Sequence, residues 1–313
     1  MRIKNNLLDL FKPILIISTT LLTILGIISF FYIPFNDTYR FNESNLIDAE
    51  LASKFGDFFG GFIGTIFSIL SFILLIYTIL HQNRQLQKSS LESNFFRMID
   101  YHNQNVNQMI IANLDSSKPN DFYEGRRAFV QFKIQIHRLF EIVRNINTTN
   151  NYQLDDIKIA DIVYMVFYYG IDGSWISFIE DKLQRYTPHH IDIANKIQAK
   201  INLNPQLKLG RPNQTFLSTY FRNMYNAIKM IDNSTILKDY EKKDLIKIYR
   251  AQLSNPELYV LFFNLISRFG KNWMTNEYII KYEFIKNLPF DYCEGYDLKN
   301  YFSINYEDEE YEI

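Results

Sequence analysis

The sequence predicts an all-α protein: a two-helix transmembrane hairpin followed by a cytosolic multi-helix domain. Two long uncharged stretches lie within the first eighty residues. Apolar side chains then recur at helical spacing, and no stretch alternates apolar and polar residues as a half-buried strand does. The expected segments, in chain order, are a cytosolic N-terminus at 1–12, spanning helices at 13–33 and 58–80 around an external loop at 34–57, a stalk helix at 81–120 and a helical cytosolic domain at 121–313.

The first uncharged stretch predicts a spanning helix from Ile14 to Ile33. A cleaved signal peptide is the alternative. Its apolar core would be longer than usual, however, and no small-x-small cleavage pattern follows it. Acidic residues prevail in the loop between the two stretches, whereas the flanks beyond them carry six basic ones: Arg2, Lys4, Lys12, Arg84, Lys88 and Arg97. The positive-inside bias therefore predicts a multi-pass protein of the lipid bilayer with both termini in the cytoplasm.

The second uncharged stretch runs for 23 residues after Asp57. As a helix it would be about 34 Å long, which is enough to cross a hydrocarbon core of about 30 Å. Small residues recur at every fourth position of its first half: Gly56, Gly60, Gly64 and Ser68. Small residues on one face allow a second helix to approach closely, so we expect this face to make helix–helix contacts and the protein to be a homo-oligomer.

The second spanning helix is expected to continue into the cytosol as the stalk, because neither glycine nor proline occurs from Thr65 through Lys118. Within the stalk, apolar side chains and one histidine are spaced by four and three residues: Phe95, Ile99, His102, Val106 and Met109. This spacing is typical of a helix that packs against a neighbour. Either a partner subunit or the next domain must cover this seam.

Further helices are expected throughout the cytosolic domain. They are predicted near 122–146, in an apolar segment capped by Asp155 and ending near Gly170, and near 175–186, 189–201, 214–231, 239–253, 256–269 and 275–287. Ser254 and Glu257 have the spacing of a capping box, which marks a helix start. Arginine and lysine side chains on the 122–146 helix offer a basic nucleic-acid face. Charged outer faces are nonetheless the ordinary condition of amphipathic helices, which favours the simpler interpretation.

Most catalytic signatures are absent from the sequence. It contains no phosphate-binding G-x-x-x-x-G-K-[ST] loop, no H-E-x-x-H zinc helix and no G-x-S-x-G elbow. The net charge of −1 gives no bulk attraction to nucleic acid. The single cysteine, Cys293, excludes an internal disulfide and is expected to be an apolar filler in a reducing cytosol. We therefore expect neither a cofactor nor a metal.

One arrangement predicts an enzyme instead. Arg97 and His102 have the Arg-x4-His spacing of HEPN-type ribonucleases. A histidine can exchange a proton during attack by a 2′-hydroxyl, while an arginine stabilises the charge that develops on phosphorus. Such spacing arises readily by chance, and His102 also falls on the apolar seam of the stalk, where a packed histidine is the simpler account. A membrane-tethered ribonuclease therefore remains the alternative.

Three segments resemble the phage abortive infection proteins of the AbiC type. The first is KFGDFFGGFIGTIFSILSFILLIYTI with the HQNRQLQ and ESNFFRMIDYHNQNV stretches that follow it; the others are GRPNQTFLSTYFRNMYNAIKMID, Gly210 to Asp232, and YRAQLSNPELYVLFFNLISRFG, Tyr249 to Gly270. The resemblance implies bacterial antiviral defence, in which an infected cell stops growing or dies before phage is released. It supplies no catalytic residue. With the spanning helices, we expect a location in the bacterial inner membrane and a trigger that is a phage protein or nucleic acid.

Four polar residues in these later segments are hard to explain by packing alone: Arg222, Arg250, Glu257 and Asn264. Buried charges and amides require partners, so we expect some of them to form a polar network in a pocket or between two helices. Ordinary exposed charges and a helix cap are the alternative. Together with the continuous stalk, these features lead to the hypothesis that the cytosolic domain detects a phage product and acts through the stalk on the membrane helix. A passive scaffold that only localises another protein is a third alternative.

Overall fold

The computed structural model describes residues 2–35, 49–116, 118 and 121–307. Most of the predicted external loop and the last six residues of the chain lie outside the described residues. The chain divides into two compact units, an N-terminal unit of Met1–Gln87 and a C-terminal unit of Lys88–Ile313. The described chain is mainly helical, as the sequence predicts.

The N-terminal unit contains α1 (Arg2–Phe35), α2 (Ala49–Asp57), a π-helix η1 (Phe58–Ile63) and the first part of α3 (Gly64–Asn107). By length and composition, one helix in the described residues is able to cross a membrane, the unbroken run Ser53–Asn107. The apolar part of α1 is shorter, Ile16–Ser29. One spanning helix is therefore found where the sequence predicts two, and the transmembrane hairpin stays a prediction.

The glycine-rich start of the long helix has π rather than α geometry. In an α-helix, residues four apart are rotated by about 40° about the helix axis relative to each other. A π turn contains more residues and therefore reduces this rotation, which keeps such residues closer to one face. A Cβ added at Gly56, Gly60 or Gly61 would meet no atom within 4 Å. The α1 helix instead approaches α3 at Gly26, where an added Cβ would lie 3.6 Å from the Phe67 ring. Gly56 and Gly60 of the predicted small-residue face are thus uncovered in this unit.

In the C-terminal unit, α3 ends at Asn107, so the predicted stalk helix at 81–120 is too long. The chain then forms a short antiparallel hairpin of β1 (Ile110–Ala112) and β2 (Phe122–Glu124), with Ile111 opposite Tyr123. The expectation that no strand is present is wrong here, as is the helix start near residue 122. β-Branched and aromatic residues suit these strands, and the chain leaves β2 through Gly125 at φ +60°.

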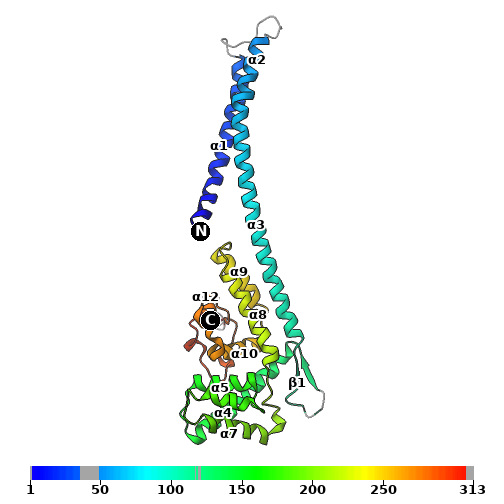
Figure 1. Ribbon diagram of the computed structural model, residues 1–313, viewed down its shortest axis with the longest axis vertical. Coiled ribbons are helices and arrows are strands. Elements are labelled where there is room, and N and C mark those ends of the chain that lie inside the picture. The colour runs from blue at the N-terminus through cyan, green and yellow to red at the C-terminus, as the bar shows by residue number, and fades with distance from the viewer. Residues whose placement is uncertain (1, 36–48, 117, 119–120, 308–313) are drawn as a thin grey trace. The chain divides into compact units, whose positions relative to one another are not determined.

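Three helices lie together at one end of the C-terminal unit: α4 (Arg127–Asn150), α5 (Asp156–Tyr169) and α7 (His190–Leu203) (Figure 1). Every residue of α5 from Ile159 to Tyr168 is buried, as expected for a helix that is apolar on nearly all sides. Asp155 caps it by accepting a hydrogen bond from the Lys158 N–H at 2.8 Å, and Gly170 ends it at φ +76°. The predicted boundaries of this helix are confirmed.

The remaining helices are α6 (Trp175–Leu183), α8 (Gln214–Asp232), α9 (Asp239–Arg250), α10 (Asn255–Ile266), α11 (Lys271–Thr275) and α12 (Tyr278–Tyr282). Short 3-10 turns lie at Pro205–Leu207, Arg268–Gly270, Phe290–Tyr292 and Leu298–Asn300. A single helix at 275–287 was expected and is wrong. The chain breaks at Glu277 and Glu283, both in the left-handed region, which allows Trp273 to pack against Tyr278 and Phe284.

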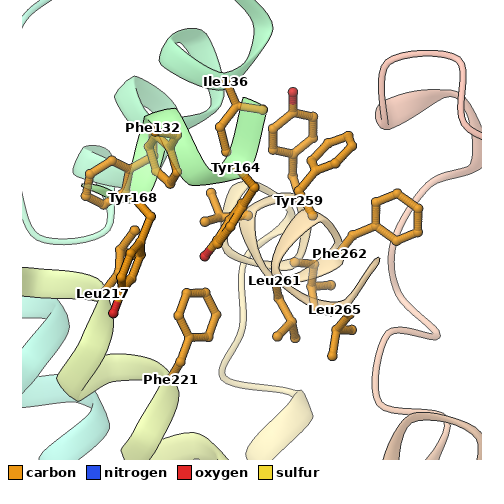
Figure 2. Packing of buried hydrophobic residues seen from close by; sticks show 14 of the residues in the cluster. Phe132, Ile136, Tyr164, Tyr168, Leu217, Phe221, Tyr259, Leu261, Phe262 and Leu265 are labelled. Carbon is orange, nitrogen blue, oxygen red and sulfur yellow. The ribbon is translucent and has the colours of Figure 1, made fainter. Parts of the chain in front are cut away.

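Aromatic side chains from several helices fill the core. Figure 2 shows Tyr164 of α5 between Phe132 of α4 and the side chains of α10, with Phe221 of α8 nearby. The predicted stalk seam belongs to the same core, because all five of its residues are buried, four on α3 and Met109 just beyond its end. Asn223 of α8 also donates a hydrogen bond to the Met98 carbonyl at 2.8 Å. The next domain therefore covers the seam.

Candidate functional site

A buried carboxylate lies in the first turn of α10. Glu257 Oε2 accepts hydrogen bonds from the Ser254 N–H at 2.8 Å and from the Ser254 hydroxyl at 2.6 Å. These bonds belong to the predicted capping box, which is confirmed. The α10 helix is apolar on most sides and packs into the core. Its packing buries the carboxylate as well, so Glu257 has no solvent exposure.

The other carboxylate oxygen faces the stalk helix. His102 of α3 is fully buried, and its Nε2 lies 3.6 Å from Glu257 Oε1. The Tyr220 hydroxyl of α8 donates to the same oxygen at 3.2 Å. The His102 ring lies 4.7 Å from the Tyr220 ring and 5.1 Å from the Tyr249 ring, measured between centroids. Four helices therefore meet at what we call the Glu257 cluster: His102, Tyr220, Tyr249 and Glu257.

The electrostatics of the Glu257 cluster favour a charged carboxylate between neutral phenols. Burial alone would raise the pKa of Glu257, but interactions with His102 and Ser254 outweigh it, so the pKa lies below its ordinary value. Burial, with the nearby charge of Glu257, raises the pKa of both Tyr220 and Tyr249. Arg126, with a half-exposed side chain, brings its Nε to 3.9 Å from Glu257 Oε2.

The Glu257 cluster is incompletely hydrogen-bonded. Within the part of the chain that the structure describes, both ring nitrogens of His102 and the Tyr249 hydroxyl are buried without a hydrogen-bond partner. Such groups are rare in native proteins because each costs about 1–3 kcal/mol. The 3.6 Å separation of His102 and Glu257 exceeds a hydrogen-bond length of about 2.9 Å by less than 1 Å. A small shift of α3 against α10 would therefore form the missing bond.

The two residues of the ribonuclease alternative point in different directions. Side chains five positions apart on an α-helix emerge about 140° from each other. His102 is accordingly buried in the Glu257 cluster, whereas Arg97 is exposed. The structure thus does not bring this pair together on one face of α3.

Two of the four polar residues singled out in the sequence share a second site, a pocket of about 190 Å³. Asn264 of α10 is 4% exposed, and its Nδ2 donates to the Tyr164 hydroxyl at 2.9 Å. Arg222 of α8 is exposed and also lines the pocket. Five aromatic residues complete most of the wall: Tyr168, Phe221, Tyr225, Phe269 and Trp273. We call this site the aromatic pocket.

The remaining predicted residue, Arg250, has a separate role at the end of α9. Its Nη1 donates to the Glu283 carbonyl at 2.8 Å, at the C-terminal end of α12. Glu257 and Asn264 lie seven residues apart on α10, or about 10 Å along the helix axis. The four residues therefore occupy three places rather than one network.

A buried ion pair was not anticipated from the sequence. Asp161 of α5 is 1% exposed and accepts from the Arg268 N–H at 2.7 Å, from Nε at 2.8 Å and from Nη2 at 2.6 Å. The Tyr186 hydroxyl donates to Asp161 at 2.7 Å. The available signal was a lone aspartate within the apolar segment IADIVYMVF, since a buried charge implies a partner.

A larger cavity of about 1190 Å³ lies between the β-hairpin, α4 and the segment before α8. Arg138 at its wall is already paired with Asp115 at 2.6 Å, and the Lys208 ammonium donates to backbone carbonyls. Asn213 donates to the Gln135 side chain at 2.9 Å and to the Phe167 carbonyl at 2.8 Å. The polar groups here mainly hold the loop that leads into α8.

The basic side chains of α4 also have internal contacts. Arg144 donates to the Glu294 carbonyl at 2.8 Å. The Lys133 ammonium lies 3.3 Å from the centre of the Tyr292 ring, and burial lowers the pKa of Lys133. Among the described residues, no group of three or more His, Cys, Asp or Glu side chains is placed to hold a metal ion. These contacts give the basic face of α4 a structural role.

The fold and these sites define a class: a helical protein whose C-terminal third makes buried polar contacts with a long helix that begins in an apolar segment. Residues 213–293 match the family model putAbiC, described as "Putative phage abortive infection protein". The match confirms the resemblance seen in the sequence over 81 of the 313 residues. It includes Arg222, Arg250, Glu257 and Asn264. No curated protein and no solved structure matches the chain.

Proposed function

We propose that this protein is a membrane-anchored bacterial effector of abortive infection, in which the cytosolic unit detects a phage product and acts on the inner membrane through α3. The observation that carries the proposal is the contact between Glu257 and His102. Glu257 lies within the segment that matches the abortive infection family. His102 lies on α3, which begins in the apolar segment that is long enough to span a membrane.

The incomplete bonding of the Glu257 cluster supports a switch at this contact. A hydrogen bond to a charged group contributes about 1.5–3 kcal/mol, which corresponds to a change of about tenfold to hundredfold in a two-state equilibrium. A trigger that moves α8 or α10 by less than 1 Å could therefore make or break the His102–Glu257 bond. Such a displacement changes how α3 is held by the unit that detects the trigger.

The membrane part of the proposal follows the sequence. Both apolar segments cross the inner membrane, both termini are cytoplasmic, and the spanning helices of several copies associate. The uncovered positions Gly56, Gly60 and Gly61 support this association, because a neighbouring helix would find no side chain in its way. The response is then a change in assembly or permeability of the membrane.

The contact can be tested in cells challenged with phage. We expect Glu257→Gln and His102→Phe to reduce protection at least tenfold at an unchanged level of membrane-inserted protein, because each removes the charge-dependent contact. Glu277→Gln is the matched control, since Glu277 is an exposed glutamate in the same matched segment. Full protection by both cluster variants at equal protein level would refute the coupling.

The membrane response has its own test. In infected cells that carry the native protein, we expect membrane potential to fall before RNA is degraded, and Gly60→Leu with Gly64→Leu to abolish this fall and the protection. RNA cleavage that precedes depolarisation would favour the ribonuclease alternative. Protection by the cytosolic unit on an unrelated membrane anchor would favour the scaffold.

A further inference from the structure

The aromatic pocket has the size of a site for one ring system. Its volume of about 190 Å³ lies above the roughly 150 Å³ of a protein cavity that holds benzene. It lies below the roughly 300–1,000 Å³ of pockets that enclose drug-sized ligands. Figure 2 shows three of its lining residues, Tyr168, Leu217 and Phe221, near one another at the edge of the core. A ligand would therefore place one flat group inside and extend the rest outward.

The walls suit a flat π-system. Tyr168 and Phe269 lie 4.7 Å apart and Tyr225 and Trp273 lie 5.5 Å apart, measured between ring centroids. The second pair packs edge to face and the first is tilted, and both leave other faces and edges to a guest ring. Aromatic side chains stack on any nucleobase, because every base has a π-face.

Three uncharged polar side chains, Ser218, Asn264 and Asn272, line the aromatic pocket, and of these Asn264 is the buried one. Asn264 is more than nine-tenths buried and uses its Nδ2 to bond the Tyr164 hydroxyl. Asn264 belongs to the pocket lining, and the Oδ1 of its side-chain amide is a hydrogen-bond acceptor. An amide carbonyl in the wall favours a guest that brings an N–H donor in the plane of its ring.

The only charged residue in the described lining is Arg222, which is exposed and therefore lies at the mouth. No carboxylate is among the described lining residues, so the guanidinium of Arg222 makes the mouth positive and attracts an anionic group outside the ring. Arginine binds phosphate through two parallel hydrogen bonds. The expected ligand thus combines a flat ring and an N–H donor, which lie inside the pocket, with an anionic group that reaches Arg222 at the mouth.

We propose that the aromatic pocket binds a nucleotide whose base carries an exocyclic amine, with the base between the aromatic walls, the amine donating to Asn264 and the phosphate at Arg222. A free nucleotide and the end of an RNA strand share this chemistry. The inference goes beyond the proposed function, because binding in the pocket does not require that the protein act on a membrane.

The test uses the full-length protein in detergent micelles, with Trp273 fluorescence and calorimetry as readouts. AMP, CMP, adenosine, inorganic phosphate and a short oligoadenylate are the probes. We expect AMP and CMP to bind and change the fluorescence. Arg222→Ala should weaken AMP about tenfold while adenosine binding stays unchanged, because only the nucleotide uses the guanidinium. Lys243→Ala, an exposed cation on α9, is the control.

Each result decides the proposal. Tighter binding of the oligoadenylate than of AMP, with the same dependence on Arg222, supports the pocket with RNA as the source. A loss of AMP affinity on Asn264→Ala adds support, and the exposed Arg222 variant keeps the test decisive if the buried Asn264 variant does not fold. Absence of binding up to millimolar nucleotide, equal binding of phosphate alone, or binding of a peptide with an aromatic C-terminal residue in place of nucleotides would overturn the proposal.

Discussion

Two buried carboxylates in the C-terminal unit differ in how fully they are bonded. Asp161 receives three hydrogen bonds from Arg268 and one from Tyr186. Glu257 is bonded by Ser254 and Tyr220, but its histidine partner stops at 3.6 Å and has no other partner among the described residues. A fully paired buried charge resists displacement, whereas an incompletely bonded cluster has a second arrangement close by. The first contact holds the fold, and the second is able to change.

The largest effect is expected when the arginine of the fully bonded pair, Asp161 and Arg268, is removed. Arg268→Ala leaves Asp161 buried and uncompensated, so we expect the free energy of unfolding to fall by about 3–5 kcal/mol. Chemical denaturation of the purified protein in detergent measures the change. Arg268→Lys should lose less, since it keeps the charge without the planar pair of donors. A loss below 1 kcal/mol for the alanine variant would contradict the assignment of this pair as a fixed point of the fold.

A smaller effect on the free energy of unfolding is expected when low pH protonates Glu257. The groups that face this carboxylate are His102, Tyr220, Tyr249 and Arg126. Because its pKa is depressed in the folded protein, Glu257 contributes stability above the ordinary glutamate pKa of about 4.3, and this contribution is lost as pH falls through the folded pKa. The stability difference between the native protein and Glu257→Gln should therefore be largest near pH 7 and shrink towards pH 3. A difference that does not change with pH would show that the charge of Glu257 is not what stabilises the cluster.

The smallest effect concerns an ion pair between α3 and the matched segment. Lys88 of α3 pairs with Glu241 of α9, and both side chains are partly exposed. Partly exposed pairs contribute about 0–1 kcal/mol and weaken with salt. We expect Lys88→Ala to lower the unfolding free energy by less than 1 kcal/mol at low salt and to have no measurable effect at 1 M salt. A larger, salt-independent loss would place the main attachment of α3 here rather than at His102.

Local signals in the sequence predicted much of this fold. The cap at Asp155, the Ser254–Glu257 capping box and the seam of α3 each depend on residues a few positions apart, so spacing alone identifies them. The β-hairpin was missed because three-residue strands show no usable alternation and depend on partners ten to fourteen residues away. The breaks at Glu277 and Glu283 were also missed, since glutamate does not mark a left-handed position as glycine does.

The candidate sites were predictable only in part. The sequence singled out Glu257 and Asn264 because polar residues within apolar helices require partners. It could not supply those partners, because His102, Tyr220 and Tyr249 come from three other helices and meet only in the folded unit. The spacing of Arg97 and His102 attracted an enzymatic interpretation, whereas the structure places His102 in a contact between helices.

One helix carries a residue of each site, and this has a thermodynamic consequence. Glu257 and Asn264 project from α10 two turns apart, and twelve residues form the helix without a break. Linkage between two sites is reciprocal. If a guest beside Asn264 changes the free energy of the contact between Glu257 and His102, then a change in that contact alters the binding free energy of the guest by the same amount. A substitution at His102, on a different helix from every residue that lines the aromatic pocket, therefore reports on the pocket through α10 and through Tyr220 of α8.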